Sequence, residues 1–343
     1  MTSAGGPPAA GGDDYLRRRV RDDPVRALRE LLSPRVAYLD LLGNVTRSTV
    51  VLASARSGST LMAELLAGQQ LRIIFEPLRA HRVRMSGNFR RGKFVEPGTD
   101  DPELHRLLHR VLTGRIRNLW VDAHNTVRLP TGRVVKEVRA NNLAPWLVTE
   151  FPDVPVVYLL RHPLATAVSA SDLSQNDHLD DLVGQADFMA RFGPAKELID
   201  RTMAERRATT AAWVLRWCLE NALPIRLLRP GSVHVVFYED LVVKPKAELD
   251  RLAGYLGQKN PARWGGWQAA PAALDRPSRS SWRDGERRPS TDERVSGWRE
   301  AVDDRELEES LELLGAFGLD RVYGAEPAPL LGPERLLLGA PTS

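Results

Sequence analysis

A turn of small residues between an apolar run and a helical pattern is the first candidate for chemistry. Residues 53–60 read ASARSGST and follow the β-branched run 49–53 (TVVLA). Such a turn aims backbone N–H groups at one spot, where the start of a helix also favours an anion. Hydroxyls from Ser59 and Thr60 and the charge of Arg56 would add to it. The turn indicates either a phosphate cradle or an ordinary strand-to-helix turn with a serine cap, and it lacks the GxxxxGK[ST] spacing of a Walker A loop.

A second candidate anion site follows the most strand-like stretch of the chain, residues 154–160 (VPVVYLL). Arg161 comes directly after this stretch, at the strand end where open α/β sheets bind ligands. A helix is predicted from Pro163, and Ser169 lies about 9 Å along it at 1.5 Å per residue. Arg161 and Ser169 would hold a second phosphate group. The alternative is a strand-end arginine paired with a surface carboxylate.

Two anion sites on neighbouring strand ends suit a nucleotide that carries phosphates at both ends of its ribose. Five segments extend this pattern in order: 49–61 (TVVLASARSGSTL), 74–77 (IFEP), 134–139 (VVKEVR), 154–169 (VPVVYLLRHPLATAVS) and 235–242 (VVFYEDLV). Together they resemble the PAPS-dependent sulfotransferases, and most of all the branch of carbohydrate and tyrosylprotein sulfotransferases with its soluble bacterial relatives. That branch has RSGS or RSGT where the cytosolic aryl branch has KSGT. PAPS is 3′-phosphoadenosine 5′-phosphosulfate.

The resemblance implies a set of donor-binding residues. The loop expected to bind the 5′-phosphosulfate consists of Arg56, Ser57, Gly58, Ser59 and Thr60. Arg161 and Ser169 match the pair that binds the 3′-phosphate, and Tyr238 matches a tyrosine near the nucleotide. His162 departs from the family, which has Asp or Asn there. Residues 278–296 are too divergent to align, so the last donor contacts are open; the arginines that would reach the nucleotide from there are Arg279, Arg283, Arg287 and Arg288.

The resemblance also implies catalytic residues. Glu76 matches a catalytic carboxylate, and Lys136 matches a lysine that stabilises the transferring group, with Arg56 beside the same group. Sulfuryl transfer needs removal of the acceptor's hydroxyl proton and stabilisation of charge on the leaving oxygen, which a carboxylate and fixed cations supply. His81 is a rival base. In the alternative interpretation Glu76 and Lys136 are surface charges at strand ends.

The elements that must position these residues alternate between strands and helices. Strands are predicted at 49–53, 71–75, 133–138, 154–160 and 233–237, and helices at 59–67, 103–119, 143–151, 163–174, 208–228, 245–257 and 303–317. The alternation predicts an α/β fold with a P-loop-like parallel sheet flanked by helices, in a single domain with loop insertions. We expect a disordered extension at 1–22, the domain at 23–324 and a tail at 325–343. The basic loop 79–93 and the segment 175–207 are expected to shape the acceptor pocket.

Composition limits which partners, locations and metal sites are expected for the chain. The chain has 343 residues and a net charge of +4, which does not indicate a nucleic-acid partner. Its cations are mostly arginine, which suits phosphate or sulfate recognition but also reflects a GC-rich genome. No apolar run of about 18 residues and no secretory signal is visible, so we expect no membrane partner and a cytoplasmic protein. Cys218 is alone, and His105 and His109 lack a third ligand, so no metal is expected.

These observations predict a sulfotransferase that moves a sulfuryl group from PAPS to a hydroxyl of a carbohydrate or other small-molecule acceptor. One alternative is a P-loop-like nucleotide kinase, which the missing Walker lysine and metal carboxylate disfavour. A second alternative is a non-catalytic nucleotide-binding relative, which the presence of Glu76 and Lys136 beside the cradle disfavours.

Overall fold

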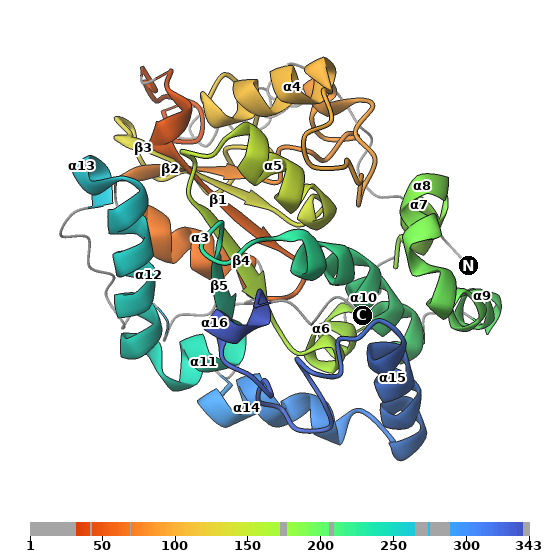
Figure 1. Ribbon diagram of the computed structural model, residues 1–343. Coiled ribbons are helices and arrows are strands. Elements are labelled where there is room, and N and C mark those ends of the chain that lie inside the picture. The colour runs from red at the N-terminus through yellow and green to blue at the C-terminus, as the bar shows by residue number, and fades with distance from the viewer. Residues whose placement is uncertain are drawn as a thin grey trace, which may run out of the picture.

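The computed structural model describes residues 32–41, 43–68, 70–171, 177–205, 209–264, 274 and 289–338. A five-stranded sheet lies at its centre, with strand order β2-β3-β1-β4-β5 and every neighbouring pair parallel (Figure 1). The strands are β1 (Ser48–Ala53), β2 (Leu71–Phe75), β3 (Gly132–Glu137), β4 (Val156–Leu160) and β5 (His234–Phe237). All their residues are buried, as expected of parallel strands covered on both faces. The predicted α/β fold with a flanked parallel sheet is confirmed.

Three helices cover one face of the sheet (Figure 1): α3 (Ser59–Ala67), α11 (Tyr238–Val243) and α12 (Pro245–Lys259). Their apolar side chains form one core cluster with alternate strand residues such as Val51 and Val157. Alternation along the strands sends the intervening residues to the opposite face.

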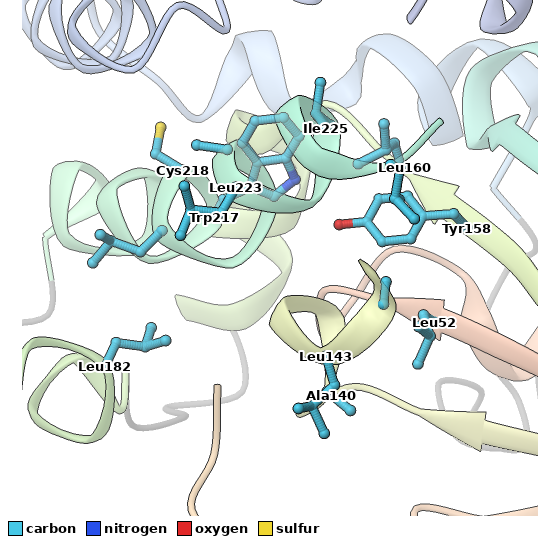
Figure 2. Close-up of a cluster of buried hydrophobic side chains, with 14 of the residues drawn as sticks. Leu52, Ala140, Leu143, Tyr158, Leu160, Leu182, Trp217, Cys218, Leu223 and Ile225 are labelled. Carbon is cyan, nitrogen blue, oxygen red and sulfur yellow. The ribbon is translucent and has the colours of Figure 1, made fainter. Parts of the chain in front are cut away.

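The opposite face carries the larger core, which Figure 2 shows in part. Its helices are α4 (Pro102–Leu112), α5 (Ala144–Glu150), α6 (Pro163–Ser171), α10 (Thr210–Leu227) and α15 (Asp304–Ala316). Trp217 and Cys218 of α10 are fully enclosed there. Helices therefore cover both faces of the sheet.

Shorter elements complete the described chain. Residues 177–205 form α7 (Leu179–Val183), α8 (Ala186–Met189), the 3-10 turn η4 (Ala190–Ala195) and α9 (Lys196–Glu205). The remaining elements are η1 (Val45–Arg47), η2 (Arg84–Ser86), η3 (Asn141–Leu143), α13 (Pro261–Trp264), α14 (Thr291–Ser296), η6 (Gly297–Glu300) and α16 (Pro333–Leu336). Helix α16 packs against β5 and buries Leu336, so part of the segment expected as a tail lies on the core. The expected extension at 1–22 falls outside the described residues.

The amino ends of the strands are called here the amino edge of the sheet. At this edge Arg72 is fully buried, and each of its side-chain nitrogens has a hydrogen-bond partner. Its Nε donates to Asp122 (2.8 Å), and Nη1 donates to Asp40 (3.2 Å) and to the carbonyl of Gly114 (2.9 Å). Its Nη2 donates to the carbonyl of Ile116. Complete pairing of this kind is what makes a buried charge tolerable.

Arg133, next to Arg72 in the β2–β3 register, is equally buried and equally satisfied. Nε and Nη2 form a fork on Asp40 at 2.7 and 2.6 Å. Nη1 donates to the carbonyls of Leu112 (3.2 Å) and Asn44 (3.3 Å). The two arginines bind the residues before β1 and the turn after α4 to the edge of the sheet.

That arrangement explains where the prediction of a helix at 103–119 was wrong. Helix α4 ends at Leu112, and Gly114 then takes a φ of 71°. A Cβ there would lie 2.2 Å from Nε of Arg133, so only glycine fits. The chain leaves the helix so that backbone carbonyls face the two arginines.

Candidate active site

The turn between β1 and α3 is held in a strained shape. Arg56 has a φ of 70° and Gly58 a φ of 84°. A Cβ on Gly58 would lie 2.6 Å from the ring of Tyr238, so this glycine lets the turn approach the start of α11. Positive φ at a non-glycine residue such as Arg56 costs energy and clusters at functional sites.

The predicted cradle residues after Arg56 are buried. Ser57 is fully buried, and its Oγ has no hydrogen-bond partner among the described residues. Ser59 and Thr60 follow as the first two residues of α3 and are 4% and 7% exposed. An unpaired buried hydroxyl costs about 1–3 kcal/mol, which a ligand oxygen at this spot would recover.

Arg161, directly after β4, connects the turn to the far end of the chain. Its Nη1 donates to the carbonyl of Arg56 (3.0 Å) and its Nη2 to the carbonyl of Arg294 (2.8 Å). Its Nε is buried and finds no acceptor in the part of the chain that is described. The guanidinium lies 4.5 Å from the ring centre of Tyr238, in a cation–π contact.

Ser169, two residues before the end of α6, contacts the turn between β1 and α3 directly. Its Oγ accepts a hydrogen bond from Nε of Arg56 at 3.0 Å. The two anion sites expected from the sequence are therefore neighbours in space, as two phosphate sites of one nucleotide must be.

Tyr238 begins α11 at the end of β5, and its hydroxyl accepts from Nε of Arg294 at 3.0 Å. Arg294 lies in α14 and was not singled out in the sequence. It belongs to the arginine-rich stretch that could not be aligned. Its basic character in that stretch was the one sequence feature that could have identified it. The other candidates in that stretch, Arg279, Arg283, Arg287 and Arg288, fall outside the described residues.

Glu76 stands at the centre of a cluster of cations. It follows β2 with a φ of 42° and is 8% exposed. Nζ of Lys136 donates to its Oε1 at 2.6 Å, and Nη1 of Arg139 donates to its Oε2 at 2.7 Å. Nη1 of Arg79 lies 3.7 Å from the same Oε2. Burial alone would raise the pKa of Glu76, but Lys136 and Arg139 outweigh it and lower the pKa to about 2.

Strand pairing brings Glu76 and Lys136 together. Phe75 and Lys136 are partners in the β2–β3 register, and the backbone N–H of Glu76 donates to the carbonyl of Lys136 at 2.8 Å. Lys136 also lies 4.5 Å from the ring centre of Phe75. Arg139 was missed in the sequence, although it lies three residues after Lys136 in the quoted segment VVKEVR.

Glu137 fixes the turn that carries Glu76. It is 1% exposed, and its carboxylate accepts backbone N–H groups of Leu78 (2.8 Å), Val138 (2.8 Å) and Arg139 (3.1 Å). Burial raises the pKa of Glu137. Its role is to position the Glu76 turn, and sequence reasoning missed it.

His81, the rival base, is exposed and contacts this cluster through Arg79. Its Nε2 accepts a hydrogen bond from Nε of Arg79 at 3.0 Å. Burial and the charges of Arg79 and Arg82 lower the pKa of His81.

Two negative observations complete the description. In the residues that the structure covers, no three His, Cys, Asp or Glu side chains gather as a metal site would require. His105 stacks on Phe151 instead, with ring centres 4.9 Å apart. None of the described helices is both long and apolar enough to cross a membrane.

Comparisons with known proteins concern the family to which the chain belongs. A model of the sulfotransferase family matches residues 49–261, more than half of the chain. Among solved structures, the chain is 17% identical to the sulfotransferase domain of the Synechococcus PCC 7002 olefin synthase, with 79% of this chain and 94% of that chain covered and a TM-score of 0.37. For the sulfotransferase domain from the curacin biosynthetic pathway the values are 16%, 75%, 98% and 0.31. The search of curated proteins found no match. On the family match, the chain belongs to the sulfotransferase family.

Proposed function

We propose that the chain transfers a sulfuryl group from PAPS to a hydroxyl of a carbohydrate or other small-molecule acceptor by in-line displacement, without a metal. One observation carries the proposal: two buried groups, Ser57 Oγ and Arg161 Nε, lack partners among the described residues. They belong to segments that meet through the hydrogen bond between Arg56 and Ser169. A ligand with two anionic groups would satisfy both.

The residues of the site fit this donor. The loop of residues 56–60 would hold the 5′-phosphosulfate at the start of α3, where backbone N–H groups and the helix dipole favour an anion. Arg161 and Ser169 would hold the 3′-phosphate, and Tyr238 and Arg294 would lie against the nucleotide. When bound, PAPS supplies an activated sulfuryl group.

Glu76 is the proposed base. It takes the proton of the acceptor hydroxyl as that oxygen bonds to sulfur and the bond from sulfur to the phosphate oxygen breaks. Lys136 and Arg56 stabilise the charge that develops on the phosphate oxygen. Glu76 is a weak base while Lys136 and Arg139 hold it, since its pKa is about 2. A bound donor that draws Lys136 toward itself would raise that pKa and make Glu76 a better base.

Replacement of Glu76 tests this assignment. We expect Glu76→Gln to lower kcat by about 10²–10⁴, the usual value of a general base, with the affinity for the product PAP (adenosine 3′,5′-bisphosphate) nearly unchanged. His81→Gln is the matched control and should retain turnover. Normal turnover in Glu76→Gln together with loss in His81→Gln would assign the base to His81.

The pH–rate profile separates the same two candidates without a mutation. The acid limb of kcat/KM reports the base in the free enzyme. With Glu76 it should lie far below the range of a histidine, because the pKa of Glu76 is about 2. The acid limb of the kcat profile should lie at higher pH than that of kcat/KM, because the bound donor competes with Glu76 for Lys136. If the acid limbs of kcat and kcat/KM coincide, the bound donor does not compete with Glu76 for Lys136.

Assays with other ligands decide between the functional classes. PAPS-dependent transfer to any hydroxyl acceptor supports the proposal. Mg²⁺-dependent consumption of ATP would favour the nucleotide kinase. PAP binding with no turnover over a broad acceptor panel would favour a non-catalytic relative.

A further inference from the structure

The side-chain amide of Asn221 in α10 uses its whole hydrogen-bonding capacity inside the core. The residue is fully buried. Its Nδ2 donates to Oγ of Ser54 at 3.0 Å and to the carbonyl of Trp217 at 2.7 Å. Its Oδ1 accepts from the hydroxyl of Tyr158 at 2.8 Å and from Nδ2 of Asn141 at 3.2 Å. Because a carbonyl can only accept, the contact with Trp217 fixes which end of the amide is the nitrogen.

The partners of Asn221 come from the ends of three strands that carry the candidate site. Ser54 directly follows β1 and begins the β1–α3 turn, residues 54–58. Tyr158 lies in β4, three residues before Arg161, and its hydroxyl points toward α10 (Figure 2). Asn141 belongs to η3, which follows β3. One amide therefore joins the carboxyl ends of β1, β3 and β4.

Ser54 holds the β1–α3 turn by its backbone as well as by its side chain. Its carbonyl accepts from the backbone N–H of Ser57 at 3.3 Å, which closes a four-residue turn. Arg56 is the third residue of that turn and has a φ of 70°, at the position where a type II turn favours glycine. Such a conformation persists only when surrounding contacts hold it. The hydrogen bonds from Asn221 and, at 3.5 Å, from Asn141 to Oγ of Ser54 are contacts of this kind.

The polar character of Asn221 is not required to fill the core. Apolar side chains of similar size often pack as well as a buried polar group, and a buried polar group costs free energy when any of its bonds is missing. The environment on α10 is largely apolar, since Trp217 and Leu219 are also buried. A network in which the central amide has every partner instead specifies a single local geometry. The geometry specified here is that of the β1–α3 turn.

We propose that Asn221 is a positioning residue for donor binding, which holds Ser54, and through Ser54 the β1–α3 turn, in place relative to Arg161 at the end of β4. The inference rests on the proposed function for the identity of the donor. Asn221 acts through Ser54 and Tyr158 and does not touch the donor, because it is fully buried.

Two variants of Ser54 that have the same shape test the role of its hydroxyl. Threonine keeps the hydroxyl, and valine replaces it with a methyl group. In calorimetric titration we expect Ser54→Val to bind PAP about tenfold more weakly than Ser54→Thr, which corresponds to the loss of one hydrogen bond. Equal PAP affinities would show that Ser54 contributes packing alone and would overturn the proposal.

A double-mutant cycle in PAP affinity tests whether Asn221 acts through Ser54. Asn221→Leu removes all four hydrogen bonds at nearly constant size and should weaken PAP binding about tenfold or more. Combined with Ser54→Val, it should weaken binding little further, because both changes break the same link. Additive losses contradict the proposal. If Asn221→Leu does not fold, Tyr158→Phe takes its place in the cycle, with a smaller expected loss and the same non-additivity.

Ser48 is the matched control at the opposite end of β1. It is fully buried, and its Oγ donates to the carbonyl of Leu112 at 2.6 Å. Ser48→Val should destabilise the fold in urea denaturation and leave PAP affinity unchanged. If Ser48→Val weakens PAP binding as much as Ser54→Val does, the effect follows from stability alone, and Asn221 has no positioning role.

Hydrogen exchange separates failure of this inference from failure of the proposed function, because it needs no donor. The backbone N–H of Ser57 should exchange about tenfold faster in Ser54→Val and in Asn221→Leu than in wild type, and at the wild-type rate in Ser48→Val. Faster exchange in a chain that does not bind PAP retains the positioning role and refutes the proposed donor. PAP binding by wild type, with unchanged exchange and affinity in the variants, refutes the positioning role alone.

Discussion

Buried arginines at the two ends of the strands differ in whether all their guanidinium nitrogens have hydrogen-bond partners. At the amino edge, Arg72 and Arg133 have a partner for every guanidinium nitrogen. At the carboxyl edge, where the strands end, Arg161 keeps a buried Nε without a partner in the described chain. A closed network stabilises the fold by itself, whereas an open one retains free donors for a ligand. Under the proposed function, Arg161 is a ligand-binding arginine, whereas Arg72 and Arg133 are structural ones.

The largest expected effect concerns the closed network. Arg72→Met should lower the free energy of unfolding by about 3–5 kcal/mol, because Asp122 would keep a buried charge without its main partner. Urea denaturation measures it, and molecules that still fold should bind PAP normally. Arg191→Met, which removes an exposed ion pair with Glu96, is the control and should leave stability nearly unchanged. A small loss in Arg72→Met would show that the amino-edge network is not structural.

His162 tests whether the carboxyl edge also contains purely structural groups. Its ring stacks on Trp298 at 4.4 Å, and burial is the largest cause that lowers its pKa from 6.5 to about 4. The unfolded chain binds the proton more tightly, so the stabilisation is complete above pH 6.5 and is lost as pH falls toward 4. The loss should be about 3 kcal/mol, seen as the difference in pH dependence between wild type and His162→Asn. Parallel curves would contradict it.

Arg161, unlike Arg72, has a buried guanidinium nitrogen without a partner in the described chain. Arg161→Ala should weaken PAP binding by about 2 kcal/mol or more, as expected when one partner of a buried charged contact is removed. Its effect on unfolding should be smaller than that of Arg72→Met. Calorimetric titration measures the affinity. Unchanged affinity, or a stability loss as large as that of Arg72→Met, would remove the distinction between the two edges.

The smallest effect concerns Gly58. Gly58→Ala and Gly98→Ala should both lose about 1–2 kcal/mol of stability, because both positions have φ near +80°, where a side chain is strained. A Cβ at Gly98 meets nothing within 4 Å, whereas one at Gly58 would strike the Tyr238 ring. Only Gly58→Ala should therefore weaken PAP binding. Equal PAP affinity in the two variants would show that the close contact with Tyr238 does not shape the site.

The sequence indicated most of the fold because its strands are short, apolar and bounded by clear breaks. Strand β2 and helix α3 have the predicted bounds, and the others differ by one to a few residues at their ends. The helix predicted at 103–119 is present, but it ends at Leu112 rather than at residue 119, because local periodicity does not show that Arg72 and Arg133 need backbone carbonyls. That requirement comes from residues far away in the chain.

The residues of the site also include some that the sequence indicated and some that it did not. The structure brings Arg56, Ser169 and Arg161 into contact, and it pairs Glu76 with Lys136, as five ordered motifs had indicated. Their roles stay predictions. The buried ion pair between Arg216 and Glu220 of α10 was not expected, because an Arg and a Glu four residues apart on a helix are usually an exposed pair. Only the packing of α10 shows that they are buried.

The contacts of Arg161 also determine when the site can form. One guanidinium joins the carbonyls of residues that lie 105 and 133 positions away along the chain. Closing such long loops is entropically costly and is completed late in folding. During synthesis from the N-terminus, the cradle is made early but lacks Arg294 until most of the chain has left the ribosome. Donor binding should therefore appear together with the last cooperative step of folding, so recovery of PAP affinity during refolding reports the native state rather than an intermediate.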